Sequence, residues 1–444
     1  MNGSSVTANP RSTYQAIPQW SERVWVMLVG ILLLNSVLRG IRPPNRWALT
    51  HFLSNYDFGF AKRSLQGAVF AALDIPAMYT YSFAFWYMMS VLAANVLILL
   101  WLMRRLCAVG DLTSRLIALV FASSLAVVVL AHIVGYGDQV GLLVTLLAVL
   151  LRDFYKRCIF VAVVFPICVL IQETQFVMFF PLLVFRFLID LGDKATEQRR
   201  KLLSLCLVCA CVFATLLIVL STRLSEASAT EMYQSIQPSV EFPLTEYGIT
   251  LTTTLTDNFR MTMDFYKKPS GYSFILFSWV VTLPITAYLM RTSWSQMIRD
   301  RQSMFLRLVA MGASAAPLAM HVIAVDANRF ASFALITSFL VYATVRLRGG
   351  VDEQLPSVPK ANVLLPAALI AMSLSSSIPL FEGYVVRSFP YEELLFDLSK
   401  VAALREPFPP HPELCFGTGD VCLFVHDGMP HSGISKADFC ANEQ

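Results

Sequence analysis

The sequence predicts an all-α, polytopic membrane helix bundle of about 11 transmembrane helices. Of the 444 residues, 56% are hydrophobic and only 14% are charged, whereas about a quarter of the residues of an ordinary globular domain are charged. Apolar runs recur along most of the chain, many of them near the length of about 20 residues that crosses a bilayer. Lysine and arginine fall between the runs in a pattern that places them on one side of a membrane.

The apolar runs predict a transmembrane domain over residues 24–378. Its candidate spans are 24–37, 81–103, 116–134, 140–151, 159–171, 176–189, 202–221, 272–290, 305–323, 330–345 and 363–378. The fourth, fifth and sixth are short. Residues 159–189 could form one long tilted helix or two half-length helices that meet at 172–175. A charge near mid-bilayer costs roughly 2.5–3.5 kcal/mol, so a pair of helices that turn at Glu173 is favoured.

The short loops on one side of this bundle carry several lysines and arginines each. The opposite turns, near 132–139, 172–175 and 322–328, carry neither residue before Arg329. Because cytoplasmic loops are enriched in lysine and arginine, the basic side is predicted to be cytoplasmic. Residues 1–23 then form a cytoplasmic tail that leads into a retained first helix, since no small-residue cleavage signal follows the first apolar run. An odd number of spans places the C-terminus outside.

Three external segments are long. Residues 39–80 have enough length for one or two interfacial helices. Residues 222–270 are polar and show little apolar periodicity, which predicts a loop or a small lid. The tail 379–444 would lie in an oxidising compartment, so a disulfide between Cys415 and Cys422 is predicted.

Ionisable residues concentrate at the external ends of the predicted spans, which makes them candidates for a functional site. The most distinctive stretch is 55–67, which joins a carboxylate, two adjacent cations and two glycines. The candidates are Asp57 as a catalytic residue, with Lys62, Arg63, His132, Asp138, Glu173, His321, Asp326 and Arg329 as substrate-binding residues.

Structural roles compete with functional ones for the carboxylates and histidines. Asp138 could be a solvated cap of the helix that follows it, and Glu173 is open to the same explanation. Asp57 could cap a helix or lie in a solvated loop, but Gly59 and the adjacent cations favour a function for it. His132 and His321 are explained slightly better as structural residues than as catalytic ones.

The cations have alternatives too. Lys62 and Arg63 could anchor their segment to lipid headgroups by extending their long side chains to the interface. Arg329 could simply pair with Asp326 across a turn. An arginine at the start of an external helix, on a side that otherwise lacks cations, is favoured as a phosphate ligand.

This arrangement resembles the C-type membrane glycosyltransferases, the GT-C superfold. An acidic residue in a first external loop with juxtamembrane helices is matched by Asp57. An acidic residue that opens an apolar helix is matched by Asp138 in the stretch 136–143. A pair of short spans is matched by 160–187, and a basic residue near the lipid phosphate is matched by Arg329. The resemblance covers about the first 220 residues and the turn at Arg329.

The resemblance implies transfer of a sugar from a polyprenyl-phosphate donor to a glycan or lipid-linked acceptor on the extracytoplasmic side. Asp57 would deprotonate the acceptor hydroxyl as a general base. Arg329, assisted by Lys62 or Arg63, would stabilise the negative charge that develops on the departing phosphate.

Two departures from the family pattern concern cofactor and acceptor. Many members have two neighbouring acidic residues in the first loop, whereas Tyr56 and Phe58 flank Asp57 here. Dependence on a divalent cation such as Mg²⁺ or Mn²⁺ therefore stays an open question. Asp138 and Glu173 would orient either the acceptor hydroxyls or such an ion. The large soluble C-terminal domain of some members is absent, so the acceptor cannot be inferred from it.

Other functions remain open. A polysaccharide polymerase that joins lipid-linked repeat units would share the topology, and a membrane transporter is the less favoured alternative, because its polar groups should lie near the midplane. The net charge of +4 follows the membrane orientation rather than a nucleic-acid surface. The expected location is a bacterial inner membrane, with a role in building cell-envelope polysaccharide and a site that faces the periplasm or exterior.

Overall fold

A computed structural model describes residues 21–191, 195–240, 242, 244, 249–348, 363–376, 380, 386–391, 424–426 and 429–431. The tail before residue 21, most of the predicted external tail, and both Cys415 and Cys422 with their predicted disulfide lie outside the described residues.

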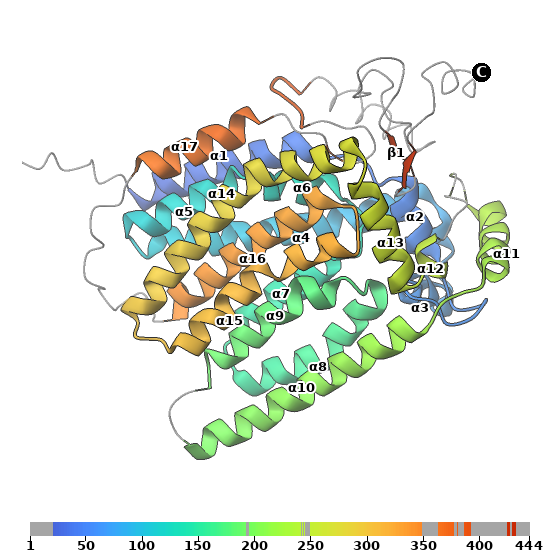
Figure 1. Ribbon diagram of the computed structural model, residues 1–444, viewed down its shortest axis with the longest axis horizontal. Coiled ribbons are helices and arrows are strands. Elements are labelled where there is room, and N and C mark those ends of the chain that lie inside the picture. The colour runs from blue at the N-terminus through green and yellow to red at the C-terminus, as the bar shows by residue number, and fades with distance from the viewer. Residues whose placement is uncertain are drawn as a thin grey trace, which may run out of the picture.

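Helices make up most of the described chain (Figure 1). The α-helices are α1 (Glu22–Gly40), α2 (Arg46–Leu53), α3 (Leu65–Ala72), α4 (Tyr81–Ala108), α5 (Leu112–Ala122), α6 (Leu125–His132), α7 (Asp138–Leu150), α8 (Phe154–Ile171), α9 (Gln175–Leu188), α10 (Ala195–Ser221), α11 (Glu226–Ile236), α12 (Ile249–Thr252), α13 (Leu255–Tyr266), α14 (Pro269–Arg299), α15 (Met304–Ala315), α16 (Ala327–Arg348) and α17 (Leu364–Ser375). The 3-10 helices are η1 (Pro76–Tyr79), η2 (Gln237–Ser239) and η3 (Ala316–Val322). Strands β1 (Phe424–His426) and β2 (Met429–His431) pair antiparallel.

Eight helical segments of the described chain are long and apolar enough to cross a membrane, which suits a multi-pass membrane protein. They are Glu22–Gly40, Tyr81–Ala108, Leu112–His132, Phe154–Ile171, Thr196–Ser221, Ile275–Arg299, Met304–Val322 and Ala327–Arg348. The predicted helical bundle is confirmed, but the predicted count of eleven spans is not. The helices α7, α9 and α17 are apolar but have 13, 14 and 12 residues, short of the roughly 20 that a span needs.

The centre of the bundle is α16, whose residues from Ala327 to Val345 are all buried. It packs against α14, α15, α9 and α6. The outer helices instead expose large apolar side chains, such as Ile31 of α1, Ile159 of α8 and Leu217 of α10. An apolar outer surface around a buried helix is the arrangement expected of a bundle in lipid, because the bilayer core holds no water to hydrate polar side chains on the outside.

Helix breaks appear at two places in the membrane domain. As the sequence predicted, α8 and α9 are separate helices, because α8 ends at Ile171 and α9 begins at Gln175. A second break, which the single predicted span 116–134 missed, divides α5 from α6. There the hydroxyls of Ser123 and Ser124 donate hydrogen bonds to the carbonyls of Val120 and Phe121, at 3.1 and 2.7 Å. Such local side-chain hydrogen bonds compete with those of a continuous helix.

The described part of the segment 222–270 is largely helical, a feature that the prediction of a loop or small lid did not include. It contains α11, η2, α12, α13 and the start of α14. The Ser225 side chain caps α11, and Thr254 with Asp257 forms a reciprocal capping box at the start of α13. These caps satisfy the first backbone N–H groups, which lets a polar stretch fold as helices despite its weak apolar pattern.

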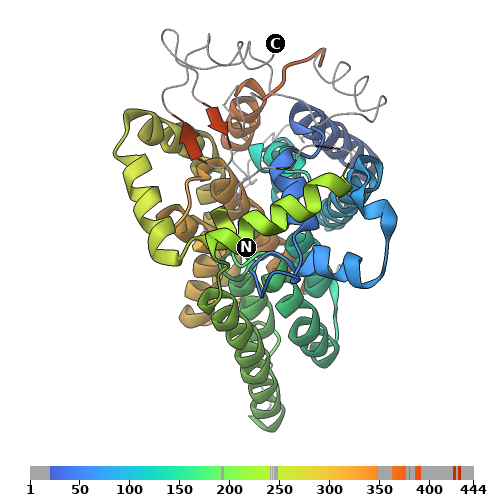
Figure 2. The same ribbon diagram turned by 90° about the vertical axis from the view of Figure 1, so that its right-hand side faces the viewer.

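The described parts of two predicted external segments, 39–80 and 222–270, gather at one end of the bundle. The first of them holds α2, α3 and η1, in line with the predicted room for one or two interfacial helices. In Figure 1 these helices and α11 to α13 lie at the right-hand end, and Figure 2 shows that end facing the viewer. Residues 222–270 and 39–80, far apart in sequence, therefore cover the same end of the membrane helices.

Candidate functional site

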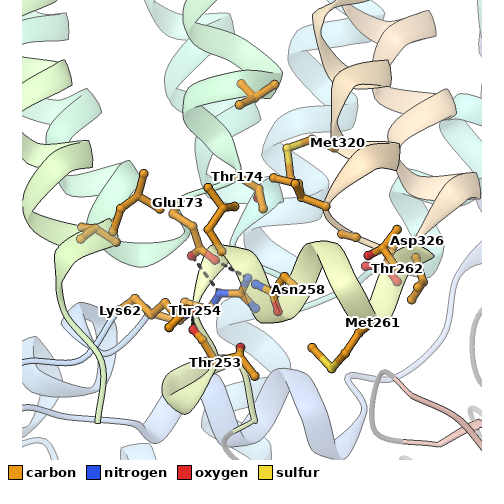
Figure 3. Close-up of a pocket in the computed structure, with 18 of the residues that line it drawn as sticks. Lys62, Glu173, Thr174, Thr253, Thr254, Asn258, Met261, Thr262, Met320 and Asp326 are labelled. Atoms are coloured by element: carbon orange, nitrogen blue, oxygen red, sulfur yellow. Dashed lines mark hydrogen bonds and ion pairs between the residues drawn. The ribbon is translucent and has the colours of Figure 1, made fainter. Parts of the chain in front are cut away.

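A cavity of about 590 Å³ lies at this end of the bundle. Its walls come from six parts of the chain: the first external loop, the 136 turn, the α8–α9 corner, the end of α10, α13, and the turn into α16. In Figure 3, Lys62 and Glu173 lie at one side of the cavity and Asp326 with Thr262 at the other, with Asn258 of α13 between them. Segments up to about 280 residues apart in the chain thus meet around one space.

The cavity wall has a charged part and an apolar part. The lining cations are Lys62, Arg63, Arg223, Lys268 and Arg329, and the lining carboxylates are Glu173, Asp264 and Asp326. The apolar part includes Val177 of α9, Leu216 and Leu220 of α10, and Met320 and Ile323 near the end of η3. A net positive charge beside an apolar wall suits a ligand with an anionic head and an apolar chain.

Arg63 and Glu173 form a bidentate pair at the α8–α9 corner. Arg63 Nε donates to Glu173 Oε2 at 3.0 Å and Arg63 Nη2 to Oε1 at 2.7 Å. Burial tends to raise the pKa of Glu173, but the charge and hydrogen bonds of Arg63, with the charge of Lys62, outweigh burial and lower the pKa to about 2. Glu173 therefore stays ionised at neutral pH, and it holds Arg63 rather than accepting protons.

The backbone of Arg63 is also held. Its φ is 67°, in the left-handed region that costs a non-glycine residue about 1–2 kcal/mol. The amide N–H of Arg63 donates to the carbonyl of Leu170 in the last turn of α8, 3.2 Å away. Main chain and side chain thus fix the first external loop to the α8–α9 corner.

Lys62 connects the same loop to α13. Its ammonium donates to the main-chain carbonyl of Thr253, 2.7 Å away, and the residue is only 6% exposed. Burial lowers the pKa of Lys62, and Arg63 acts in the same direction, whereas Glu173 and Asp257 oppose the shift. The cation is held inside the site, which excludes the alternative that Lys62 extends to lipid headgroups.

Arg329, in the first turn of α16, has two carboxylate partners. Its Nη1 lies 2.7 Å from Asp326 Oδ2, and its Nε lies 3.2 Å from Asp138 Oδ2. Asp138 is fully buried and also accepts a 3.3 Å hydrogen bond from Thr174 Oγ1. Asp138 is therefore an ion-pair partner behind the cavity wall and not a solvated cap, while Asp326 pairs with Arg329 as the alternative interpretation expected.

Arg63 and Arg329 both line the cavity, and each keeps one terminal nitrogen that its carboxylate partners do not engage. Among the described residues, no hydrogen bond or ion pair engages Nη1 of Arg63 or Nη2 of Arg329. Guanidinium groups bind phosphate oxygens through charge-assisted hydrogen bonds. Carboxylates hold the rest of each group, so these donors are oriented before a ligand arrives.

Four predicted site residues lie outside the cavity lining: Asp138, which lies behind the wall, and Asp57, His132 and His321. Asp57, the predicted general base, is exposed, and its carboxylate accepts a 2.7 Å bond from Asn55 Nδ2. His132 is buried at the end of α6, where its carbonyl accepts a bond from Arg42. His321 contacts the Leu318 carbonyl through Nδ1 and accepts from Trp279 through Nε2. The two histidines thus have structural surroundings, and the catalytic role of Asp57 stays a prediction.

Several lining residues were missed by the sequence analysis. Trp47 and Tyr136 come from the first external loop and the 136 turn, and Arg223, Asn258 and Lys268 come from the segment 222–270. The capping signature of Thr254 and Asp257 could have shown that this segment begins a helix. No local signal places that helix over the cavity.

A divalent cation does not fit the donor set seen here. Within the described part of the chain, no group of three or more His, Cys, Asp or Glu side chains gathers in one place. Of the lining carboxylates, Glu173 is paired with Arg63, Asp326 with Arg329 and Asp264 with Lys267. A hard cation prefers several free oxygen ligands, which these pairs do not supply. The prediction of Mg²⁺ or Mn²⁺ gains no support from these residues.

Comparison with protein-family models, with curated proteins and with solved structures found no match to this chain.

Proposed function

We propose that this protein is a membrane glycosyltransferase that moves a sugar from a polyprenyl-phosphate donor to an acceptor on the extracytoplasmic side of a membrane, with a bundle of the GT-C type. The observation that carries the proposal is the composition of the cavity wall, where arginines with oriented free donors adjoin an apolar surface. A lipid phosphate offers the matching chemistry: an anionic head on a long apolar chain.

The apolar wall would take the isoprenoid chain. Leu216 and Leu220 belong to α10, whose outer face exposes Leu207, Leu217 and Ile218. A chain that lies against α10 could extend from the cavity into the surrounding lipid without exposing apolar surface to water. The phosphate would then lie among Lys62, Arg63 and Arg329.

The cations would act on the leaving group. As the bond from the sugar to the lipid phosphate breaks, negative charge develops on the departing phosphate. Fixed donors already aimed at that position stabilise the transition state without reorganising. The energy for transfer is stored in the lipid-linked bond, so the reaction calls for no nucleotide.

The general base is better assigned to Asp326 than to Asp57. Asp326 lines the cavity and has a side chain that is 20% exposed, whereas Asp57 does not line it. Glu173 is a poor base, because its pKa is about 2. Asp326 Oδ2 is held by Arg329, which leaves Oδ1 to accept a proton from an acceptor hydroxyl.

The test is a reconstituted assay with a polyprenyl-phosphate-linked sugar as donor. Asp326→Asn should lower kcat by about 100-fold or more, the usual scale for loss of a general base, while Asp57→Asn should retain the activity of the unmodified protein. Arg329 keeps Asp138 as a partner in the first variant, so thermal unfolding should confirm that it is folded.

Three outcomes of this assay separate the possibilities. Loss of activity in Asp57→Asn but not in Asp326→Asn would assign the general base to Asp57 of the first external loop. Product size, one added sugar or a long chain, separates a transferase from a polymerase. If the unmodified protein neither binds the donor more tightly than the matching dephosphorylated alcohol nor releases its sugar, the proposal is wrong.

A further inference from the structure

A second cavity, of about 740 Å³, lies at the opposite ends of the same helices. The helix α16 contributes Arg329 of its first turn to the external cavity and Arg348, its last residue, to the second. The helix α9 likewise contributes Val177 near its start and Arg186 near its end. With 22 residues, α16 is about 33 Å long, close to the thickness of a bilayer core. The two cavities therefore open toward opposite membrane faces.

Cations outnumber carboxylates around the second cavity. The lining cations are Arg105, Arg152, Arg186, Lys201, Arg346 and Arg348, and the lining carboxylates are Asp153, Asp190 and Glu197. They come from the ends of α4, α9 and α16, the start of α10, and the residues before α8. Lysine and arginine at these helix ends place the cavity on the cytoplasmic side.

One carboxylate holds this cluster together. Asp190 Oδ2 lies 2.8 Å from Nη1 of the fully buried Arg157 and also contacts Arg186. Asp190 Oδ1 lies 3.7 Å from Arg348 Nε, and its main-chain carbonyl accepts a 3.1 Å bond from Lys201. A single negative charge is thus shared among three guanidinium groups, which leaves a fixed excess of positive charge beside the cavity.

The other carboxylates nearby do not neutralise this excess, although Asp111, which does not line the cavity, pairs with the lining Arg346 at 2.9 Å. Glu197 pairs with Lys201 at 2.7 Å, and Asp153 accepts the Lys156 amide as the cap of α8. Among the described residues, Arg105 and Arg152 form no ion pair, and both are exposed. An exposed arginine on a surface needs no partner, because water solvates its charge. Exposed arginines beside a cavity that already has excess positive charge are, however, well placed to bind an anion.

We propose that this cavity binds a phosphate-bearing anion, either the headgroup of an acidic lipid of the cytoplasmic leaflet or a soluble phosphate compound. Arginine binds phosphate oxygens in a planar, two-pronged geometry, and basic pockets between transmembrane helices on this side suit acidic headgroups. Phe154 and Leu347 in the wall offer apolar surface for the first carbons of a lipid's acyl chains. The proposal is independent of the sugar transfer proposed for the external cavity.

The test uses the full-length protein in detergent, with bound species counted by native mass spectrometry. The probes are short-chain phosphatidylglycerol, zwitterionic phosphatidylcholine and inorganic phosphate. The variant is Arg105→Gln with Arg348→Gln, which removes two exposed lining cations. The matched control is Arg104→Gln with Arg291→Gln, which removes the same charge from exposed positions on the same side that do not line the cavity.

The unmodified protein should bind phosphatidylglycerol or phosphate in preference to phosphatidylcholine. The lining variant should lose about tenfold in affinity, equal to about 1.4 kcal/mol, while the control should stay within about twofold. Selective binding of phosphatidylglycerol identifies a lipid headgroup, and competition by inorganic phosphate identifies a soluble ligand. Equal losses in both double variants, or no preference in the unmodified protein, would overturn the proposal. Neither result depends on transferase activity.

Discussion

Arg63 combines an unusual backbone with an unusual side-chain environment. A positive φ at a non-glycine residue is uncommon and persists only where its surroundings hold it. Here the Leu170 carbonyl accepts from its amide, and Glu173 accepts from two of its nitrogens. The first external loop therefore presents Arg63 to the cavity at a defined position, which a ligand with a charged head can use.

Removing the carboxylate should show how much this pair contributes to stability. In Glu173→Gln, the 12% exposed Arg63 side chain would lose its ionised partner, and breaking a buried pair costs about 3 kcal/mol or more. The Tm in detergent should fall clearly. Glu231→Gln on the exposed face of α11 is the control, and its Tm should be nearly unchanged. Equal Tm values for the two variants would show that the pair contributes nothing.

The pair should also have a defined pH dependence. Because the pKa of Glu173 is lowered from 4.5 to about 2, its contribution to stability is complete above about pH 4.5 and is lost as the pH falls toward 2. The Tm difference between the unmodified protein and Glu173→Gln should therefore be constant from neutral pH to about pH 5, then shrink in stronger acid. A difference that disappears already near pH 6 would contradict this assignment.

At the scale of elements, α13 covers the external cavity and is tied to the first external loop by Lys62. The bond from Lys62 to the Thr253 carbonyl lies just before α13 begins. Lys62→Met should remove a charge-assisted bond of about 1.5–3 kcal/mol. Amide exchange within Leu255–Tyr266 should then be about tenfold faster. Lys267→Met is the control, since Lys267 pairs only with Asp264 on the surface. Equally fast amide exchange in that variant would show that the Lys62–Thr253 hydrogen bond does not hold α13 in place.

The helices that were predicted correctly are those whose signal lies within a short stretch of sequence. The turn at Glu173 follows from the cost of a buried charge, and α8 and α9 do separate there. The helices within 222–270 were not predicted, because they depend on caps at Ser225 and Thr254 and on packing against other segments. The prediction was based on apolar periodicity, which does not indicate helix caps or contacts with distant segments.

At the scale of the whole molecule, the described part of the chain carries two large cavities of different character. The external one joins cations to an apolar wall, and the opposite one is lined by five arginines, three of them exposed. The sequence indicated that Lys62, Arg63, Glu173, Asp326 and Arg329 lie on one side, and these residues do share a cavity. It could not indicate that Asp57 lies outside the lining, since residues five positions apart in an irregular loop can point in unrelated directions.

The opposite orientation of the two cavities can be measured. Single cysteines would be introduced at Glu231 of α11 and at Tyr155 near the start of α8, both exposed positions, in a cysteine-free background. A thiol reagent that cannot cross membranes should label Glu231→Cys in intact cells, and Tyr155→Cys only after the membrane is opened. Labelling of both positions from the same side would contradict the topology.

The most direct test of the external site is a structure of the full-length protein with polyprenyl phosphate bound. The expected result has the phosphate within hydrogen-bond distance, about 3 Å, of Arg63 or Arg329, and the isoprenoid chain against Leu216 and Leu220 of α10. A phosphate bound away from both arginines, or a cavity that stays free of the lipid at saturating concentration, would contradict it.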